Sequence, residues 1–250
     1  MRKLIYLLVI VFINLNSYAQ VNATLQQAQN FERQLKEDAA LEKYKEVIAA
    51  DATLLPIMVK CAELSASIGA RAKDNVNRKN YYEAALAYAK KAYQLDANSY
   101  LANYAMAMAC GKMTEVTEEN KAIVAYVKDV KEYVEKAIAL NPNDPKVNYT
   151  LGKWHWEMVT LNWAKKVAVK ALYGGLPKGD INTAISYFEK CRKLDMYFVV
   201  NYLELAKAYK YDNKPAKAIE ICNILVKLPL RTANDALYKE EGKALLQSLL

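Results

Sequence analysis

The sequence predicts an all-α protein, a right-handed α-solenoid of helix pairs with extended first helices and a C-terminal capping helix. Two observations carry this prediction. Of the 250 residues, 54% are hydrophobic and only seven are Gly and six Pro, a composition that favours packed helices. Apolar residues recur at spacings of three and four, and no alternating pattern typical of a strand reaches a useful length.

The stretch 130–155 shows the repeating unit most clearly. A helix carrying apolar residues four and three apart stops at Pro142, and a second helix starts near Pro145. This stretch resembles the junction of two tetratricopeptide repeats, whose 34-residue pattern is W-x2-L-G-x2-Y…A-x3-F…P. The residues that match are Ala137, Pro142, Leu151 and Gly152, and those that depart, where Trp and Tyr are usual, are Asn148 and His155.

Extending this frame predicts one tetratricopeptide-like solenoid over residues 20–250. Repeats two and three are eleven residues longer than the pattern, which is about three helical turns, so the insert either lengthens a helix or forms a longer loop. In repeat four, apolar spacing predicts a first helix that continues to Tyr173 and ends at Gly174-Gly175. The expected repeats are 21–54, 55–99, 100–144, 145–198 and 199–232, followed by a cap at 233–250.

The segment 151–191 resembles the regulator of microtubule dynamics family. Both have an L-G-x-W start, a Leu-x-Trp further along the same helix, a Gly/Pro hinge and an A-x3-F helix. The matching residues are Leu151, Gly152, Trp154, Leu161, Trp163, Gly174, Pro177, Ala184 and Phe188. The resemblance extends over 55–250. In animals this family is associated with microtubules and organelle membranes. For an exported bacterial chain, it implies the architecture and a mode of binding rather than tubulin as the partner.

Residues 1–19 have the pattern of a secretory signal peptide. Arg2 and Lys3 precede an apolar run over 4–13, and Ser17-Tyr18-Ala19 is a small-x-small cleavage site. The alternative is an uncleaved anchor, although the run is short for a spanning helix. We therefore expect an exported protein, periplasmic if the source is a Gram-negative bacterium, and not an integral membrane protein after cleavage.

The charge of the chain is moderately positive. The formal net charge is +8, and removing 1–19 leaves 33 Lys and Arg against 27 Asp and Glu, a net charge of +6. This excess permits an acidic partner or an anionic membrane surface without requiring either. No block of Lys and Arg indicates a nucleic-acid-binding tail, so we expect no nucleic-acid partner.

No pattern in the chain predicts catalysis, a metal site or a cofactor. His155 is the only histidine and falls at a helix-packing position, so it lacks the partners that a zinc site or a catalytic base needs. No phosphate-binding loop, dinucleotide fingerprint or nucleophile elbow occurs. In an exported protein four cysteines can form disulfides, yet all four fall at repeat-packing positions, which favours buried thiols; they are Cys61, Cys110, Cys191 and Cys222.

The first helix of each repeat should line the concave groove of the solenoid. The positions that face this groove in repeats three to five are basic and aromatic together, which would attract an anion and offer rings for stacking. The alternative is that the rings pack under the inserts and the lysines face solvent. The predicted ligand-binding residues are Tyr104, Met108, Lys112, Lys146, Tyr149, Lys153, Trp156, Lys207, Lys210 and Tyr211.

Two functions fit this groove. The first is a non-enzymatic scaffold that holds a protein or peptide partner, with an acidic segment in the groove. The second is a carrier or binder of an anionic amphiphile such as a phospholipid. An enclosed apolar groove would favour the amphiphile, and an open polar groove would favour the peptide.

Overall fold

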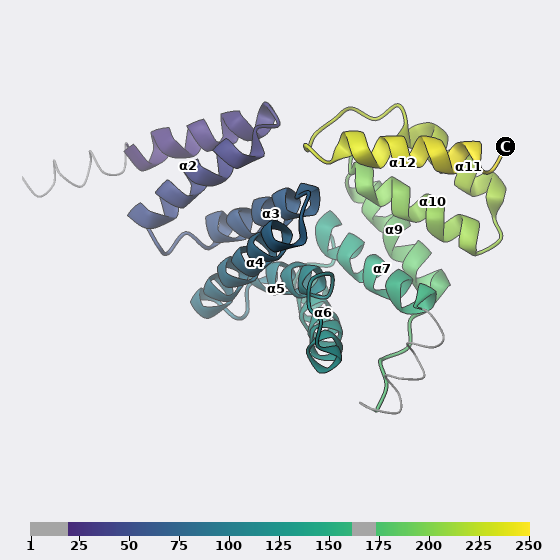
Figure 1. The fold of residues 1–250 in the computed structure, drawn as a ribbon, viewed down its shortest axis with the longest axis horizontal. Helices are drawn as coiled ribbons and strands as arrows, with labels where there is room; N and C mark the ends of the chain where they lie inside the picture. The colour runs from purple at the N-terminus through teal and green to yellow at the C-terminus, as the bar shows by residue number, and fades with distance from the viewer. Residues whose placement is uncertain (1–19, 162–173) are drawn as a thin grey trace, which may run out of the picture.

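The structure, a computed structural model, describes residues 20–161 and 174–250. Within these ranges every regular element is a helix, which confirms the predicted all-α class. Residues 20–33 form the first helix that is described (Figure 1). The helices that follow are α2 (Glu37–Ala50), α3 (Leu55–Arg71), α4 (Asn75–Leu95), α5 (Tyr100–Met113), α6 (Asn120–Leu140), α7 (Pro145–Thr160), α9 (Ile181–Leu194), α10 (Val199–Tyr211), α11 (Pro215–Leu225) and α12 (Asp235–Gln247).

Short polar turns begin and end these helices as the sequence dictates. The carboxylates of Asp74, Asp144 and Asp180 each accept a hydrogen bond from a backbone N–H of the following helix, at 2.7–2.9 Å. Pro145 and Pro215 stand at the first position of α7 and α11, where no backbone donor is needed. The turns therefore fix where each pair of helices starts.

The helices pack as antiparallel pairs, and the first helices of successive pairs contact one another: α3 with α5, α5 with α7, α7 with α10, and α10 with α12. The small residues of the repeat frame lie on the second helices of the pairs and have no solvent exposure; they are Ala40, Ala85, Ala92, Ala137, Ala184 and Ala218. Small side chains let neighbouring backbones approach closely, so the periodicity read from the sequence locates the core.

The extra residues of repeats two and three lie mainly in the second helices. Helices α4 and α6 have 21 residues each, while the other second helices, α2, α9 and α11, have 14, 14 and 11. The eleven-residue inserts are thus largely helical, which resolves the choice between helix and loop. In repeat four the described helix α7 ends at Thr160, because the backbone of Leu161 is extended. The prediction of one continuous helix to Tyr173 is therefore wrong, and residues 162–173 lie outside the described ranges.

Asn148, one of the two departures from the repeat pattern, has a structural role. Its side-chain amide donates to the carbonyl oxygens of Pro142 and Asp144, at 2.9 and 2.7 Å, and so ties α7 to the turn before it. Asn103 makes the same pair of bonds at the start of α5, each 2.8 Å long. A buried amide here satisfies carbonyls that a tryptophan could not.

The two ends of the solenoid meet. The turn before α12 reaches toward α2 and α3, as Figure 1 shows at the top of the view. The backbone N–H of Ala233 donates to Glu37 at 3.0 Å, and the Asn234 side chain donates to the Ser67 backbone at 3.2 Å. The C-terminal cap thus contacts the N-terminal helices as well as its neighbours α10 and α11.

No helix in the described ranges is both long enough and apolar enough to cross a bilayer.

Candidate functional site

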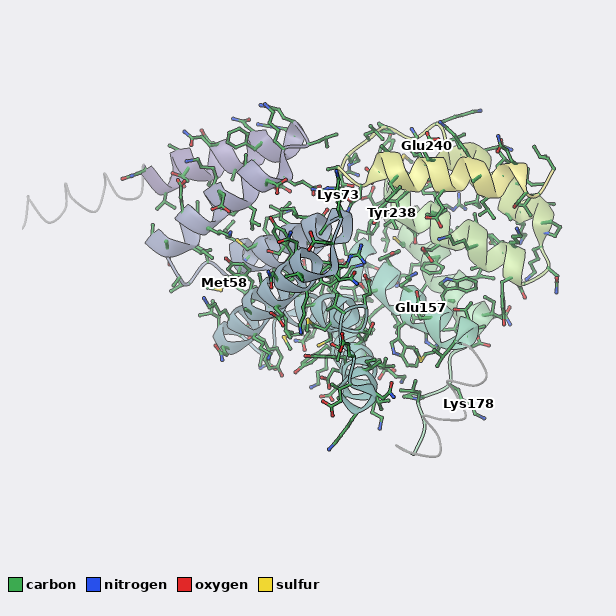
Figure 2. The ribbon with its side chains drawn as sticks, viewed as in Figure 1. Met58, Lys73, Glu157, Lys178, Tyr238 and Glu240 are labelled. Carbon is green, nitrogen blue, oxygen red and sulfur yellow. The ribbon has the colours of Figure 1, made fainter. Side chains whose placement is uncertain are left out.

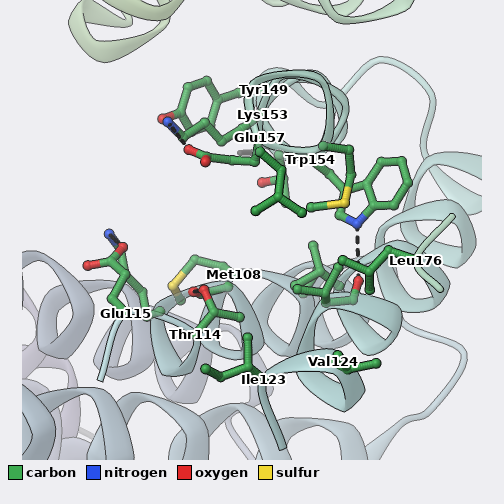
Figure 3. Close-up of a pocket in the computed structure, with 18 of the residues that line it drawn as sticks. Met108, Thr114, Glu115, Ile123, Val124, Tyr149, Lys153, Trp154, Glu157 and Leu176 are labelled. Atoms are coloured by element: carbon green, nitrogen blue, oxygen red, sulfur yellow. Dashed lines mark hydrogen bonds and ion pairs between the residues drawn. The ribbon is translucent and has the colours of Figure 1, made fainter. Parts of the chain in front are cut away.

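A groove of about 720 Å³ lies between α5, α6 and α7 (Figure 3). Its volume is within the range of sites that bind small molecules or the side chains of a partner. Most of its lining is apolar and comes from Met108, Ile123, Val124, Val127, Val130, Trp154, Met158, Leu161 and Leu176.

Trp154 forms the firmest part of the apolar wall. Its indole N–H donates to the backbone carbonyl of Val127 at 3.0 Å, drawn as a dashed line in Figure 3. The ammonium of Lys131 lies 5.6 Å from the centre of the ring, within the range of a cation–π contact. Trp154 is buried and links α7 to α6. The groove is therefore held open by a fixed contact between its two walls.

One end of the groove is charged. Lys112 of α5 pairs with Glu115 at 2.7 Å, and Glu115 also accepts from the Tyr82 hydroxyl at 2.9 Å. Across the groove, Lys153 of α7 pairs with Glu157 at 2.7 Å and with Glu204 of α10 at 2.9 Å. Both lysines that line the groove thus have carboxylate partners.

The environment of Lys153 keeps it charged. Burial by itself lowers the pKa of the Lys153 ammonium, but the carboxylates of Glu204 and Glu157 outweigh it and raise that pKa. Glu204 is nearly buried, whereas the side chain of Glu157 is 54% exposed. An incoming anion could therefore replace Glu157 on Lys153, while Glu204 would stay in place.

The predicted ligand-binding residues divide into three groups in the structure. Met108, Lys112, Tyr149 and Lys153 line the groove. Tyr104 and Lys146 meet at Glu63 of α3 instead. The Lys146 ammonium lies 2.5 Å from the Glu63 carboxylate and 6.0 Å from the centre of the Tyr104 ring.

The third group packs toward α10 and α12. The rings of Trp156 and Tyr211 meet edge to face with centroids 5.4 Å apart. Lys207 pairs with Glu241 of α12 at 2.7 Å, and Lys210 donates to the hydroxyl of Ser248 at 2.9 Å. Lys153 and Lys207 do share one space, because both contact Glu204. Their role in binding a ligand stays a prediction.

Sequence reasoning missed the wall that α6 contributes: Ile123, Val124 and Val127. The start of α6 falls in the eleven-residue insert of repeat three, which the sequence left as either a helix or a loop. Its apolar residues could therefore not be assigned to positions that face the groove. The signal that could have found them is the match between α4 and α6. Counted back from Leu95 and Leu140, the last residues of the two helices, Val127 stands where α4 has Tyr82.

The remaining reactive side chains pack in the structure. His155 accepts a hydrogen bond at Nδ1 from the backbone N–H of Asp180, at 3.3 Å, and stacks on Tyr187 with centroids 6.3 Å apart. The four cysteines are buried and free, as predicted, and burial raises the pKa of the Cys61 and Cys110 thiols to about 12. Across the described ranges, no three His, Cys, Asp or Glu residues are grouped so that they could hold a metal ion.

Solved structures resemble this fold. A thermophilic TPR protein of Thermus thermophilus aligns with a TM-score of 0.64 and 13% identity, covering 91% of this chain and 99% of the other. The PilF protein of Pseudomonas aeruginosa aligns with a TM-score of 0.52 and 13% identity, covering 94% and 90%. At this identity the likeness concerns the fold alone, and it confirms a tetratricopeptide-like solenoid.

Curated relatives are similar in sequence. Regulator of microtubule dynamics protein 1 of Pongo abelii is 30% identical over 210 residues, which are 83% of this chain and 65% of the relative. Regulator of microtubule dynamics protein 2 of Mus musculus is 30% identical over 145 residues, 57% and 35% of the two chains. Regulator of microtubule dynamics protein 1 of Caenorhabditis elegans is 27% identical over 160 residues, 64% and 70%. The match thus spans about a third of the mouse protein.

The prediction of an exported, periplasmic protein is contradicted by these relatives, which are eukaryotic regulators of microtubule dynamics. That prediction depended on residues 1–19, which lie outside the described ranges. A short apolar run after two basic residues indicates affinity for an apolar phase. Such affinity does not by itself define the compartment in which a protein is located.

The model of one protein family matches residues 24–250, nearly the whole chain. The matched range includes the Leu151-Gly152 motif and its partner Phe188. A side chain added at Gly152 would lie 2.9 Å from the Phe188 ring, so this motif is a close contact between α7 and α9. The chain belongs to the family described as regulator of microtubule dynamics protein 1-3.

Proposed function

We propose that this protein is a non-catalytic scaffold that binds a protein partner in the groove between α5, α6 and α7. The observation that carries the proposal is a preformed apolar groove with an ordered, charged end, on a solenoid fold that presents such surfaces. The names of the relatives favour a partner that belongs to the cytoskeleton.

The lining of the groove defines the chemistry of this partner. Apolar side chains of one helix face or one extended segment would anchor it against Trp154, Met158 and Val127. An acidic residue of the partner could pair with Lys153 by displacing Glu157, the more exposed of its two carboxylates. We therefore expect affinity to come mainly from buried apolar area, with a smaller salt-dependent part.

The test is a variant that fills the groove. Val127→Trp places an indole in the space that Val127 leaves open, and Val76→Trp on the exposed start of α4 is the matched control, since Val76 is 71% exposed. Proteins that bind the wild-type chain and the control, but not Val127→Trp, are groove partners, and titration calorimetry should show at least about a tenfold loss of their affinity. Equal binding of every partner by both variants would refute the proposal.

A second candidate is the binding of an anionic amphiphile, and the apolar lining with lysines at one end favours it. Dodecanoate and dodecanol are suitable probes because they share a chain and differ in charge. If the amphiphile is the ligand, dodecanoate should bind more tightly than dodecanol, and Val127→Trp should block both. Absence of binding by either probe would exclude this candidate for the groove.

A further inference from the structure

A second groove lies between α2 and α4, the second helices of the first two repeats, which both pack on α3. This α2–α4 groove has a volume of about 520 Å³, and its lining includes Ile48, Met58 and Tyr88. Figure 2 shows Met58, near the start of α3, between the ends of α2 and α4. Met58 is only 4% exposed, and its thioether is a favourable contact for an aromatic ring.

The neighbouring second helices, α4 and α6, show what fills the same place one repeat later. Counted back from their last residues, α2, α4 and α6 align residue for residue. Tyr93 of α4 meets Tyr133 of α6 edge to face, with ring centroids 5.4 Å apart. In this alignment Tyr88 corresponds to Tyr133, but Ile48 corresponds to Tyr93. The α2–α4 groove therefore has one ring of the pair and lacks the other.

The same alignment reveals a missing carboxylate. Lys91 of α4 and Lys136 of α6 are equivalent, and the ammonium of each lies over the tyrosine of its own helix, 5.9 and 5.6 Å from the ring centre. Lys136 also pairs with Glu132, at 2.7 Å. Ala87 stands at the equivalent place in α4, and no carboxylate among the described residues forms an ion pair with Lys91. Lys91 can therefore pair with an anion from another molecule.

Lys45 brings a second positive charge to the α2–α4 groove. Its partner Glu42 is 2.8 Å away, and the side chain of Glu42 is 67% exposed. Such a surface pair contributes little to stability, so an incoming anion can exchange with Glu42. Asp51 and Asp96, which follow the two helices, accept hydrogen bonds within their own turns and do not line the groove.

We propose that the α2–α4 groove binds a segment of a partner protein that carries an aromatic side chain next to an acidic one. The ring takes the place that Tyr93 has one repeat later, edge to face with Tyr88 and in contact with Met58. The carboxylate pairs with Lys91, as in the equivalent ion pair of α6. The groove is open at its edge, where Leu95 is 44% exposed, which suits an extended protein segment. The proposal does not depend on the groove between α5, α6 and α7.

The first test gives the chain the two missing groups. Ile48→Tyr supplies the ring and Ala87→Glu supplies the carboxylate, and both copy the residues found at the equivalent places of α4 and α6. The double variant should unfold at a temperature no lower than wild type, since it gains a ring pair and a helical ion pair. Glu46→Tyr, which adds a ring to an exposed site of α2 outside the groove, is the matched control. A double variant that melts below this control would overturn the proposal.

The second test measures binding with short random peptides displayed on phage. They are first depleted on the double variant, which removes binders of other sites, and are then selected on the wild-type chain. We expect the recovered peptides to share an aromatic residue adjacent to Asp or Glu. Failure to recover peptides, or recovery of peptides without this pair, would overturn the proposal.

The recovered peptides are then synthesised and their affinities measured by fluorescence anisotropy. They should bind the double variant about tenfold more weakly than wild type, or weaker still, whereas Glu46→Tyr and Val127→Trp should bind like wild type. Changing the acidic residue of a peptide to its amide should matter less at high salt, and removing its ring should matter equally at both. Equal binding by the double variant would overturn the proposal. Loss of binding in Val127→Trp would also overturn it, because it would assign the peptides to the groove between α5, α6 and α7.

Discussion

The two long second helices, α4 and α6, have the same length and opposite surroundings. Tyr82 of α4 is fully buried between α3 and α5, and its hydroxyl reaches Glu115. Val127 occupies the same place in α6 and leaves the groove open. Two glycines of the first helices, which are not at equivalent repeat positions, also differ in their surroundings: a Cβ added to Gly69 would lie 2.8 Å from Tyr82, whereas one added to Gly111 meets only Val130, at 3.8 Å. At the position of Tyr82 and Val127 the closed repeat has a buried tyrosine and the open repeat has a valine that lines the groove.

Exchanging the two residues should give the largest effect. Tyr82→Val opens a cavity in repeat two and removes the hydrogen bond to Glu115, at a cost of about 3 kcal/mol in unfolding free energy. Val127→Tyr adds volume where space exists, so the loss should stay below about 1 kcal/mol. Urea denaturation followed by circular dichroism measures both. Equal losses would show that the repeats do not differ in this way.

The two glycines, one tightly packed and one with space around it, give a second pair. Gly69→Ala forces Tyr82 to move and should cost about 1–2 kcal/mol. In Gly111→Ala the added Cβ would lie 3.8 Å from Val130, an ordinary contact distance. This variant should stabilise the chain by up to about 1 kcal/mol, because alanine favours a helix interior. Thermal unfolding should separate the variants in opposite directions. A loss in both would mean that α5 and α6 are closer than the structure has them.

The lysines at the charged end form a third pair. Lys153→Met leaves the nearly buried Glu204 with only Lys207, at 3.4 Å, and should cost about 1–2 kcal/mol. Lys112→Met removes the ion pair of the half-exposed Glu115, which keeps its hydrogen bond from Tyr82, and should cost about 0.5 kcal/mol or less. Chemical denaturation at low and high salt measures these losses. Similar losses for both would show that burial of Glu204 does not matter.

The ion pairs of Glu204 also limit what can be learned from reversing the charge of its lysine partners. Reversing Lys153 and Lys207 together would surround Glu204 with negative charge. Such a variant would lose stability along with any binding, so its loss of binding would be uninformative.

The smallest effect concerns pH at the end of α7. Burial lowers the pKa of His155 below its ordinary value of 6.5 and Lys131 adds to this shift, while the carboxylates of Asp180 and Glu135 oppose it. As pH falls through the ordinary value, the unfolded chain binds a proton more readily than the folded chain, and stability falls. His155→Asn keeps an acceptor that does not titrate. It should lose less stability than wild type between about pH 7.5 and 5.5. An identical pH dependence of stability in the variant and the wild type would show that His155 does not contribute to it.

The sequence by itself determined the repeats and their core. Ala85, Ala137 and Ala184 could be placed at helix contacts because a helix repeats every 3.6 residues and a solenoid repeats its contacts along the chain. The missing backbone donor of proline located Pro145 at the start of α7, and the repeat frame located the four cysteines in the interior. The second helices of repeats two and three absorbed the inserts without disturbing this frame.

Only the tertiary structure decided what the groove contains. Lys153 was predicted to face the groove, but its partner Glu204 lies on another repeat, and no spacing within one helix specifies such a pair. Lys146 meets Glu63 of α3, and Asn234 meets Arg71, by the same kind of distant contact. Periodicity fixes which face of a helix turns inward. The curvature of the whole solenoid decides which charges then meet there, because it sums small rotations over every repeat.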